Sequence, residues 1–500
     1  MSRLLIVSNR LPLTVQKPSN GGGVEISSGG LVTALRSVVR QREGCWIGWA
    51  GTDRDPAIER RLRTDIALDS CRMVPLFLSK EEHQDFYCGF CNEILWPLFH
   101  DLQSRCNFEP AYWQRYLKVN ARFADVVCSE AKPGDLVWIH DYHLMLQGKL
   151  LSGRIGRKRL MYFHHIPFPP ADVFEKLPWR LEILESLLSF GTVGFQTIRD
   201  RRNFIGCVRR FLPAMKIRRS GFHLSVGQNS DRAVVGAFPI GIDFNEFAGL
   251  ATKPEVVQQR EQVRKNLKNC RIVLGVDRLD YTKGIPERLK AFRNLLTRYP
   301  GLHRNISLIQ IVVPSREDIP KYQELKMQVE RLVTEINGHF GRTSWVPVHY
   351  QHRHLSREEL VAYYCAADIA LITPLKDGMN LVAKEFCASR VDEKGVLVLS
   401  EFAGAASQLR TGALLVNPYD TEKVASAIYE AFHMSPAEVQ RRMRRMRRRV
   451  SLDDVHRWCS QFFEQGSLIG MDDDEEALED TPQLPRGERK TTLAAAMGEQ

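Results

Sequence analysis

No stretch of this 500-residue sequence approaches the roughly 18 consecutive apolar residues that a membrane-spanning helix requires. The first residues, MSRLLIVSNR, run straight into a strand-like segment and lack the pattern of a secretory signal peptide. No unit of about 20 to 50 residues recurs, which argues against a solenoid or a propeller. From these absences we expect a soluble, cytoplasmic protein.

Patterns that bind metals or form disulfide frameworks are also missing. The eleven cysteines stand at irregular spacings, often inside apolar runs such as the one around Cys128, which is typical of reduced, buried thiols. Cys88 and Cys91 have a C-x-x-C spacing, but no second pair or histidine cluster accompanies them. Structural packing is therefore favoured over a redox pair or half of a zinc site, and we expect no metal.

The formal net charge of +11 suits nucleic acid, an anionic membrane surface, or small phosphorylated ligands, and charge alone does not choose among them. The densest basic run, RRMRRMRRRV over residues 441–450, follows Ser435, Pro436 and Glu438, which predict a helix start. Apolar residues inside this helix fall on one stripe, namely Val439, Met443, Met446 and Val450. A solvated helix face is favoured over a nucleic-acid patch.

The length exceeds what one hydrophobic core usually organises, so two domains are expected. The opening strand-like segment LLIVSN is followed by a glycine-rich loop and a helical pattern, the order that begins a Rossmann-like unit. Further short apolar runs alternate with helical stretches in two series. The fold class is therefore α/β, with two Rossmann-like, doubly wound parallel-sheet domains that face a cleft.

We place the N-terminal domain at residues 1–245 and the C-terminal domain at 246–450. Residues 451–467 are expected to form a last helix that packs across the domains. From about residue 471 the composition changes to DDDEEALED and a polar tail, which predicts disorder over 471–500.

Polar residues at the carboxyl ends of parallel strands should gather at the cleft. In GVDRLDYTKG, Arg278 and Lys283 follow an apolar strand and could hold a departing diphosphate. The alternative is that the two cations form surface ion pairs with Asp277 and Asp280.

A second segment, TPLKDGMNLVAKE, places Asp377 after a strand and Glu385 on a helix expected to begin near Met379. The helix N-terminus can receive a phosphate, Asp377 can bind sugar hydroxyls, and Glu385 can bind a ribose. The alternative is an ordinary capping aspartate with an exposed glutamate.

The first domain offers a further set of candidates around its own strand ends. These are Arg10, the Gly29–Gly30 loop, the aromatic residues Tyr87 and Trp96, and the strand-end residues Asp141 and His165. Arg316, at a strand end of the second domain, can supply another cation for a substrate phosphate. Taken alone, the two aromatic residues are more typical of core packing.

The ordered motifs SNRLP, SSGGLVTAL, WIHDYHL, HIPFP, GFQT, FPIGID, GVDRLDYTKG and DGMNLVAKE make the chain resemble trehalose-6-phosphate synthases, which are retaining glycosyltransferases of the GT-B architecture. The resemblance implies that acceptor glucose 6-phosphate contacts Arg10, Tyr87, Trp96, Asp141 and Arg316. It implies that the donor contacts Gly29, Gly30, Arg278, Lys283, Asp377, Met379, Asn380, Leu381, Val382 and Glu385. His165, Arg278, Lys283 and Asp377 would carry the catalysis.

The resemblance further implies a reaction without metal or cofactor, in which the departing phosphate takes the acceptor's proton on the front face. UDP-glucose is the favoured donor, and ADP-glucose and GDP-glucose remain alternatives. A homo-oligomer is also left open. A separate phosphatase is expected to act on the product, and neither nucleic acid nor a membrane is expected as a partner. The alternatives are a glucosylglycerol-phosphate synthase that uses glycerol 3-phosphate, and a non-catalytic sugar-phosphate sensor.

Overall fold

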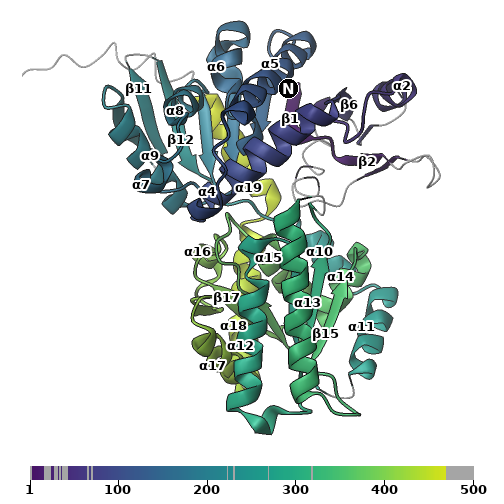
Figure 1. The fold of residues 1–500 in the computed structure, drawn as a ribbon. Helices are drawn as coiled ribbons and strands as arrows, with labels where there is room; N and C mark the ends of the chain where they lie inside the picture. The colour runs from purple at the N-terminus through teal and green to yellow at the C-terminus, as the bar shows by residue number, and fades with distance from the viewer. Residues whose placement is uncertain are drawn as a thin grey trace, which may run out of the picture.

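The structure is a computed structural model that describes residues 3–15, 24–26, 32, 35, 43–64, 67–68, 71–221, 223–228, 231–267, 270–316 and 319–468. These residues form two lobes, one above the other in Figure 1, each built around its own sheet. A small hairpin of β2 (Leu13–Val15) and β3 (Val24–Ile26) forms a third, two-stranded sheet.

The N-terminal lobe holds a ten-stranded sheet with the order β10-β11-β12-β9-β8-β7-β1-β4-β6-β5. Its strands are β1 (Leu4–Arg10), β4 (Gly44–Trp49), β5 (Ala67–Leu68), β6 (Cys71–Leu76), β7 (Leu136–His140), β8 (Leu160–His164), β9 (Thr192–Phe195), β10 (Lys216–Ser220), β11 (His223–Gln228) and β12 (Asp231–Ala237). The central strands are parallel, and Leu4–Val7 of β1 pair in register with Leu136–Ile139 of β7. The β10, β11 and β5 pairings at the edges are antiparallel, which the sequence did not predict.

The C-terminal lobe holds a six-stranded, all-parallel sheet with the order β15-β14-β13-β16-β17-β18. Its strands are β13 (Arg271–Arg278), β14 (Ile306–Val313), β15 (Val348–His352), β16 (Ile369–Ile372), β17 (Val396–Ser400) and β18 (Leu414–Val416). The predicted α/β class with two parallel-sheet units is confirmed.

Both faces of each sheet are buried, which explains why the strands are apolar along their whole length. In β1, Leu5 and Val7 enter one core cluster, and Leu4 and Ile6 enter the other, because successive side chains point to opposite faces. In β13, Val273 enters one core cluster and the residues on either side of it enter the other. Each lobe is therefore a three-layer arrangement of helices, sheet and helices.

The helices cover these faces. In the N-terminal lobe they are α2 (Pro56–Thr64), α3 (Lys80–Glu82), the π-helix η2 (His83–Leu95), α4 (Trp96–Phe99), η3 (Gln103–Arg105), α5 (Pro110–Glu130), η4 (Tyr142–Leu144), α6 (Gln147–Leu151), η5 (Ser152–Gly156), η6 (Arg157–Arg159), α7 (Ala171–Phe174), α8 (Arg180–Leu188) and α9 (Ile198–Phe211). In the C-terminal lobe they are α10 (Phe244–Leu250), α11 (Pro254–Asn266), η7 (Tyr281–Lys283), α12 (Ile285–Arg298), η8 (Pro300–Leu302), α13 (Pro320–Phe340), α14 (Arg357–Ala366), α15 (Leu381–Ser389), α16 (Ala406–Leu409), α17 (Thr421–His433) and α18 (Pro436–Leu452). Among the described helices, none combines the length and apolar character needed to cross a membrane.

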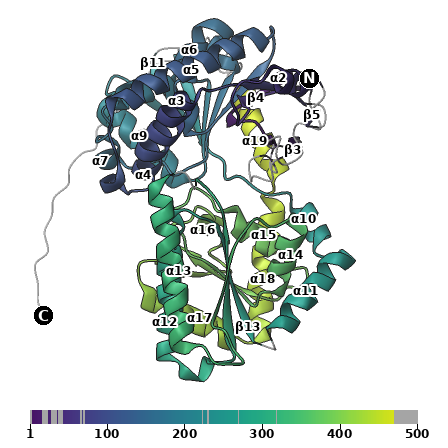
Figure 2. The same ribbon diagram turned by 45° about the vertical axis from the view of Figure 1, so that its right-hand side comes forward.

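The last described helix, α19 (Val455–Leu468), returns to the N-terminal lobe, as Figures 1 and 2 show in yellow. Trp458 packs on Trp138 of β7 and Phe163 of β8. The predicted limits of this helix, 451–467, differ from the observed ones. Ser451 still belongs to α18, because the Asp454 side chain accepts a hydrogen bond from the Arg457 amide (2.8 Å), so α19 starts only at Val455. The predicted domain limits remain a prediction, and residues 471–500 lie outside the described part.

The basic run on α18 is largely occupied by local contacts. Met443, Met446 and Val450 are buried, as the stripe predicted. Arg444 pairs with Glu393, and Arg447 donates to the Cys387 carbonyl (2.8 Å) at the end of α15.

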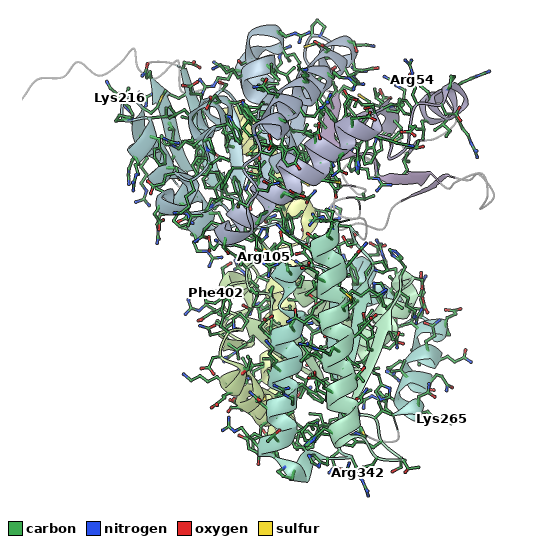
Figure 3. The ribbon with its side chains drawn as sticks, viewed as in Figure 1. Arg54, Arg105, Lys216, Lys265, Arg342 and Phe402 are labelled. Atoms are coloured by element: carbon green, nitrogen blue, oxygen red, sulfur yellow. The ribbon has the colours of Figure 1, made fainter. Side chains whose placement is uncertain are left out.

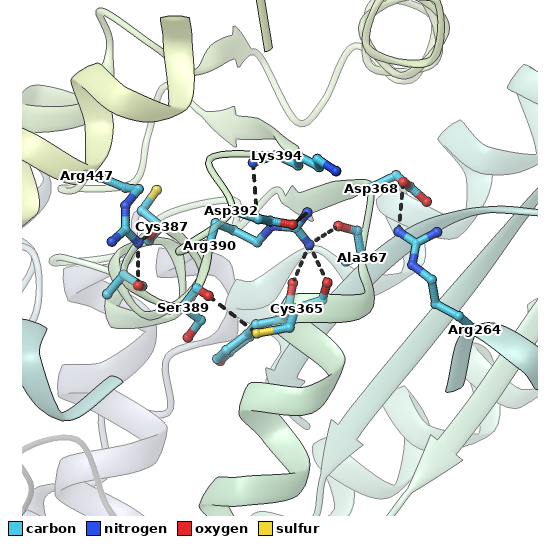
Figure 4. A network of polar contacts seen from close by, with 12 residues as sticks. Arg264, Cys365, Ala367, Asp368, Cys387, Ser389, Arg390, Asp392, Lys394 and Arg447 are labelled. Carbon is cyan, nitrogen blue, oxygen red and sulfur yellow. Dashed lines mark hydrogen bonds and ion pairs between the residues drawn. The ribbon is translucent and has the colours of Figure 1, made fainter. Parts of the chain in front are cut away.

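Figure 4 shows Arg447 beside Arg390, which is buried and donates from Nη1 to the Cys365 and Ala367 carbonyls (2.6 and 2.7 Å) at the end of α14. Each arginine therefore satisfies carbonyls that a helix end leaves unpaired.

Candidate active site

The two lobes meet at the carboxyl ends of their strands. Figure 3 labels Arg105 and Phe402 close to the junction. Lys321 donates to the Arg105 carbonyl (2.8 Å), and Lys376 pairs with Asp101 across the same junction. The backbone of Gly378 lies so close to His165 that an added Cβ would stand 2.1 Å from the His165 carbonyl oxygen. The segments in which the sequence predicts chemistry therefore touch each other.

The two predicted diphosphate cations lie at the end of β13 and just beyond it. Arg278 is exposed and makes no ion pair with any described residue. Lys283 ends η7, and its Nζ lies 2.5 Å from Asp377 Oδ2. The alternative in which these cations pair with Asp277 and Asp280 is wrong, because Asp277 pairs with the buried Arg288 and Asp280 pairs with Arg316.

Asp377 stands between β16 and α15. Burial acts against its ionisation, but the Lys283 ammonium outweighs burial and lowers the pKa of Asp377. The alternative of a capping aspartate is wrong, because the N-cap is Asn380, which has a φ of 78° and accepts from the Ala383 amide (3.2 Å). For the same reason α15 begins at Leu381, two residues later than predicted.

Glu385 lies one turn inside α15. Its Oε2 accepts a hydrogen bond from the Tyr364 hydroxyl of α14 (2.8 Å), and burial raises its pKa. Met379 and Asn380 are buried at the start of the same helix, and Leu381 and Val382 are half-buried. The amides of this first turn and the Glu385 carboxyl thus belong to one short helix.

His165 and Asp141 follow neighbouring strands of the N-terminal sheet. The Asp141 residue adopts a φ of 72°, and its Oδ1 accepts from the His165 amide (3.2 Å). Burial raises the pKa of Asp141 to about 6 and lowers the pKa of His165 to about 3. At neutral pH the site therefore contains an uncharged imidazole.

A row of aromatic rings runs along the N-terminal side of the junction. Its ring centroids are separated by 4.6 Å for Trp49–His83, 5.2 Å for His83–Tyr87, 5.9 Å for Tyr87–His143, 3.9 Å for His143–Tyr142 and 5.8 Å for Tyr142–Trp96. We call these six residues the aromatic row. The π-helix η2 contributes His83 and Tyr87, and such wide turns are frequent at functional sites.

An arginine stands at each end of the aromatic row. The guanidinium carbon of Arg10 lies 5.6 Å from the Trp49 ring centroid, and that of Arg316 lies 4.3 Å from the Trp96 ring. The side chain of Arg316 is only 7% exposed and also contacts Asp280 (3.1 Å). The indole nitrogens of Trp49 and Trp96 are buried and have no hydrogen-bond partner among the described residues. A buried donor without a partner is costly, so both indoles fit a polar ligand.

Sequence reasoning placed most of these residues and missed some. It did not find Trp49, His83, Tyr142 or His143 of the aromatic row, although the polar and aromatic residues of WIHDYHL offered a signal for the last two. Gly29 and Gly30 lie outside the described residues. Across the described ranges, no group of three or more His, Cys, Asp or Glu residues could hold a metal ion.

Two Rossmann-like lobes that face each other across cations, a helix N-terminus and a row of aromatic rings define the chain as a GT-B glycosyltransferase. The model of glycosyltransferase family 20 matches residues 2–467, and the chain belongs to this family.

Curated relatives carry more specific names. A trehalose-6-phosphate synthase of Mycobacterium sp. (strain JLS) is 44% identical over 469 residues, which are 93% of this chain and 96% of the relative. A bifunctional trehalose-6-phosphate synthase/phosphatase of Thermoproteus tenax is 43% identical over 476 residues. That match covers 92% of this chain, which spans only 63% of the relative's length.

Solved structures are similar over almost the whole chain. An E. coli protein described as trehalose-6-phosphate bound with UDP-2-fluoro glucose has a TM-score of 0.84 and 35% identity, covering 93% of this chain and 99% of the other. A UDP-forming alpha,alpha-trehalose-phosphate synthase of Burkholderia xenovorans in complex with glucose-6-phosphate has a TM-score of 0.83 and 32% identity, covering 93% of this chain and all of the other.

Proposed function

We propose that this chain transfers glucose from UDP-glucose to glucose 6-phosphate, with retention of configuration, and so forms trehalose 6-phosphate. The observation that carries the proposal is the junction itself, where Arg278, Lys283 and the start of α15 from one lobe meet His165 from the other. The solved relatives that contain a UDP sugar and glucose-6-phosphate support the choice of substrates.

On the donor side, Arg278 and Lys283 bind the diphosphate together with the first turn of α15, Asp377 and His165 bind the glucose, and Glu385 binds the ribose. Gly29, Gly30, Met379, Asn380, Leu381 and Val382 complete this proposed site. Arg278 supports the role because it is an exposed cation that forms no ion pair with a described carboxylate. Two cations and a helix N-terminus can stabilise the charge that grows on the leaving diphosphate.

On the acceptor side, Arg10, Tyr87, Trp96, Asp141 and Arg316 bind glucose 6-phosphate. Arginines suit the phosphate and aromatic rings suit the sugar, and the aromatic row carries both kinds of group. The unpaired indole N–H of Trp96 can donate to an acceptor oxygen.

The chemistry needs positioning more than a protein base. Because burial lowers the pKa of His165 to about 3, its neutral imidazole is too weak a base to take the acceptor's proton at neutral pH. The departing phosphate oxygen therefore takes the acceptor's proton while both substrates are held between the lobes. Closure of the lobes excludes water from the reaction.

The product contains a phosphate ester, and a phosphatase is the class of enzyme that consumes it. The second activity in the name of the Thermoproteus relative has this chemistry.

A donor panel tests the proposal. Purified protein is incubated with UDP-, ADP- or GDP-glucose and with glucose 6-phosphate or glycerol 3-phosphate, and the products are identified by mass and by NMR of the anomeric linkage. We expect trehalose 6-phosphate from UDP-glucose. Turnover only with glycerol 3-phosphate would refute glucose 6-phosphate as the acceptor. Binding of the sugar phosphate without release of a nucleotide would favour a non-catalytic sensor.

Two variants test the diphosphate site. Arg278→Ala and Lys283→Ala should each lower kcat by about 100-fold or more, because each removes a charge that the leaving group needs. The exposed Lys394 provides the control, and Lys394→Ala should keep the wild-type rate. Near-normal rates in both site variants would place the diphosphate elsewhere.

A further inference from the structure

The backbone of one residue, Ile240, stands between the two halves of the proposed donor site. Ile240 lies in the segment that connects β12 of the N-terminal lobe to α10 of the C-terminal lobe. Its N–H donates to Gln196 Oε1 (3.0 Å), and its carbonyl accepts from Lys384 Nζ (2.5 Å). Gln196 and Lys384 are each only 1% exposed, so water does not compete for either bond.

The bond from Ile240 determines how the Gln196 amide is oriented. A backbone N–H can only donate, so the group that faces it must be the amide oxygen, and the amide NH₂ must face the other way. There it lies 3.4 Å from His165 Nδ1. Since the NH₂ group can only donate, His165 Nδ1 is an acceptor and carries no proton.

The remaining proton of the neutral His165 ring is therefore on Nε2. This nitrogen lies 3.0 Å from His140 Nδ1, to which it donates. Burial lowers the pKa of both histidines, which keeps the pair uncharged. One tautomer of His165 is thus selected by a chain of hydrogen bonds that begins at the Ile240 peptide.

The carbonyl of the same residue, which belongs to the next peptide group, holds α15. Lys384 belongs to this helix, next to Glu385, and reaches back to Ile240 across the lobe boundary. The charged groups that act on Lys384 are Asp453, which caps the end of α18, and Arg449 of that helix, and Lys384 forms no ion pair with any described residue. A buried lysine that is bonded only to a carbonyl lowers stability, so packing alone does not explain it.

We propose that Gln196 and Lys384 are positioning residues that act through the backbone N–H and C=O of Ile240. Gln196 selects the tautomer and orientation of the His165 imidazole, and Lys384 sets α15 in register with it. The proposal rests on the proposed function, in which His165 and α15 bind the donor. The close approach of Gly378 to the His165 carbonyl leaves little space for misalignment, so a displaced α15 also displaces the reacting glucose.

Kinetics of Gln196→Met, Lys384→Met and the double variant test this idea, because methionine is similar in length to each side chain and removes its hydrogen-bonding groups. We expect each single variant to lower kcat by about tenfold to 100-fold, since displacements near 1 Å have effects of this size. The KM for glucose 6-phosphate should stay unchanged. The double variant should lose scarcely more than the worse single variant, because both side chains act on the backbone of one residue, Ile240. Lys394→Met is the matched control and should behave as wild type.

A second measurement reports the tautomer directly. In protein labelled with ¹⁵N-histidine, the wild type should show His165 protonated at Nε2, and Gln196→Met should shift the signal towards a mixture. If Gln196→Met does not fold, Lys384→Met still tests the contact between Lys384 and the Ile240 carbonyl.

The outcomes separate the two proposals. A wild-type protein without transferase activity refutes the proposed function. An active wild type whose Lys384→Met and Gln196→Met variants keep its kcat refutes the positioning role. A double variant whose loss in kcat equals the product of the two single losses also refutes it. So does a His165 ring that is protonated at Nδ1.

Discussion

Replacing Lys384 by methionine should change how the stability of the folded chain depends on pH. Burial lowers the pKa of Lys384 from its ordinary 10.5 to about 7. Between these two values the unfolded chain binds one proton more than the folded chain, so the free energy of unfolding rises with pH. The two pKa values differ by about 3.5, which corresponds to roughly 5 kcal/mol of the free energy of unfolding. This stability is absent below pH 7 and is fully present by about pH 10.5.

Between pH 7 and pH 9 this linkage amounts to about 2 kcal/mol. Urea unfolding of the wild type and of Lys384→Met at pH 7, 8 and 9 measures it, because all other titrating groups cancel in the difference. We expect the free energy of unfolding of the wild type to rise by about 2 kcal/mol relative to that of the methionine variant between pH 7 and pH 9. The exposed Lys394 gives the control, since Lys394→Met should follow the wild-type profile. Parallel profiles for wild type and Lys384→Met would show that Lys384 is charged well above pH 7 and would refute the reasoning.

Three further changes have defined outcomes. Arg390→Met leaves the Cys365 and Ala367 carbonyls without their buried donor and should lower the free energy of unfolding by about 3 kcal/mol, measured by urea unfolding. Asp141→Asn should abolish the fall in kcat/KM for glucose 6-phosphate that protonation of this carboxyl causes below about pH 6; a pH profile with the same limb in both proteins would contradict this. Gly378→Ala places a methyl group against the His165 carbonyl and should lower kcat by about 100-fold, measured at saturating substrates; a wild-type kcat would contradict this.

The sequence predicts the position of the site better than its internal contacts. Arg278, Asp141 and His165 each follow an apolar strand, and parallel strands present their carboxyl ends at one edge, so their approach to the junction follows from local pattern. The partners of Lys283 and Arg316 do not follow in this way. Asp377 and Lys283 lie 94 positions apart in the chain, and their contact depends on the β13–β16 pairing, which no local pattern encodes.

Local exceptions also escaped prediction. Asn380 adopts a left-handed conformation and delays the start of α15, although the preceding glycine and methionine suggested an earlier start. The aromatic row joins Trp49 of β4 to Trp96 of α4 through rings of η2 and η4, and its members are typical of core packing when each is taken alone. Only their common direction along the junction, with an arginine at each end, distinguishes them from a core.

The ion pairs at the junction explain how a strongly cationic site can remain folded without its ligands. Lys283 and Arg316 each have an ion-pair partner, whereas the exposed Arg278 forms no ion pair with a described residue, so it is available to an arriving diphosphate. Under the proposed function, Lys283 then exchanges Asp377 for the diphosphate, and this exchange frees the Asp377 carboxylate to accept hydrogen bonds from glucose hydroxyls. Binding of the phosphate and recognition of the sugar are therefore coupled through one lysine. A donor that lacks the diphosphate or the glucose leaves a buried charge without a partner. This is a physical basis for selecting the complete nucleotide sugar.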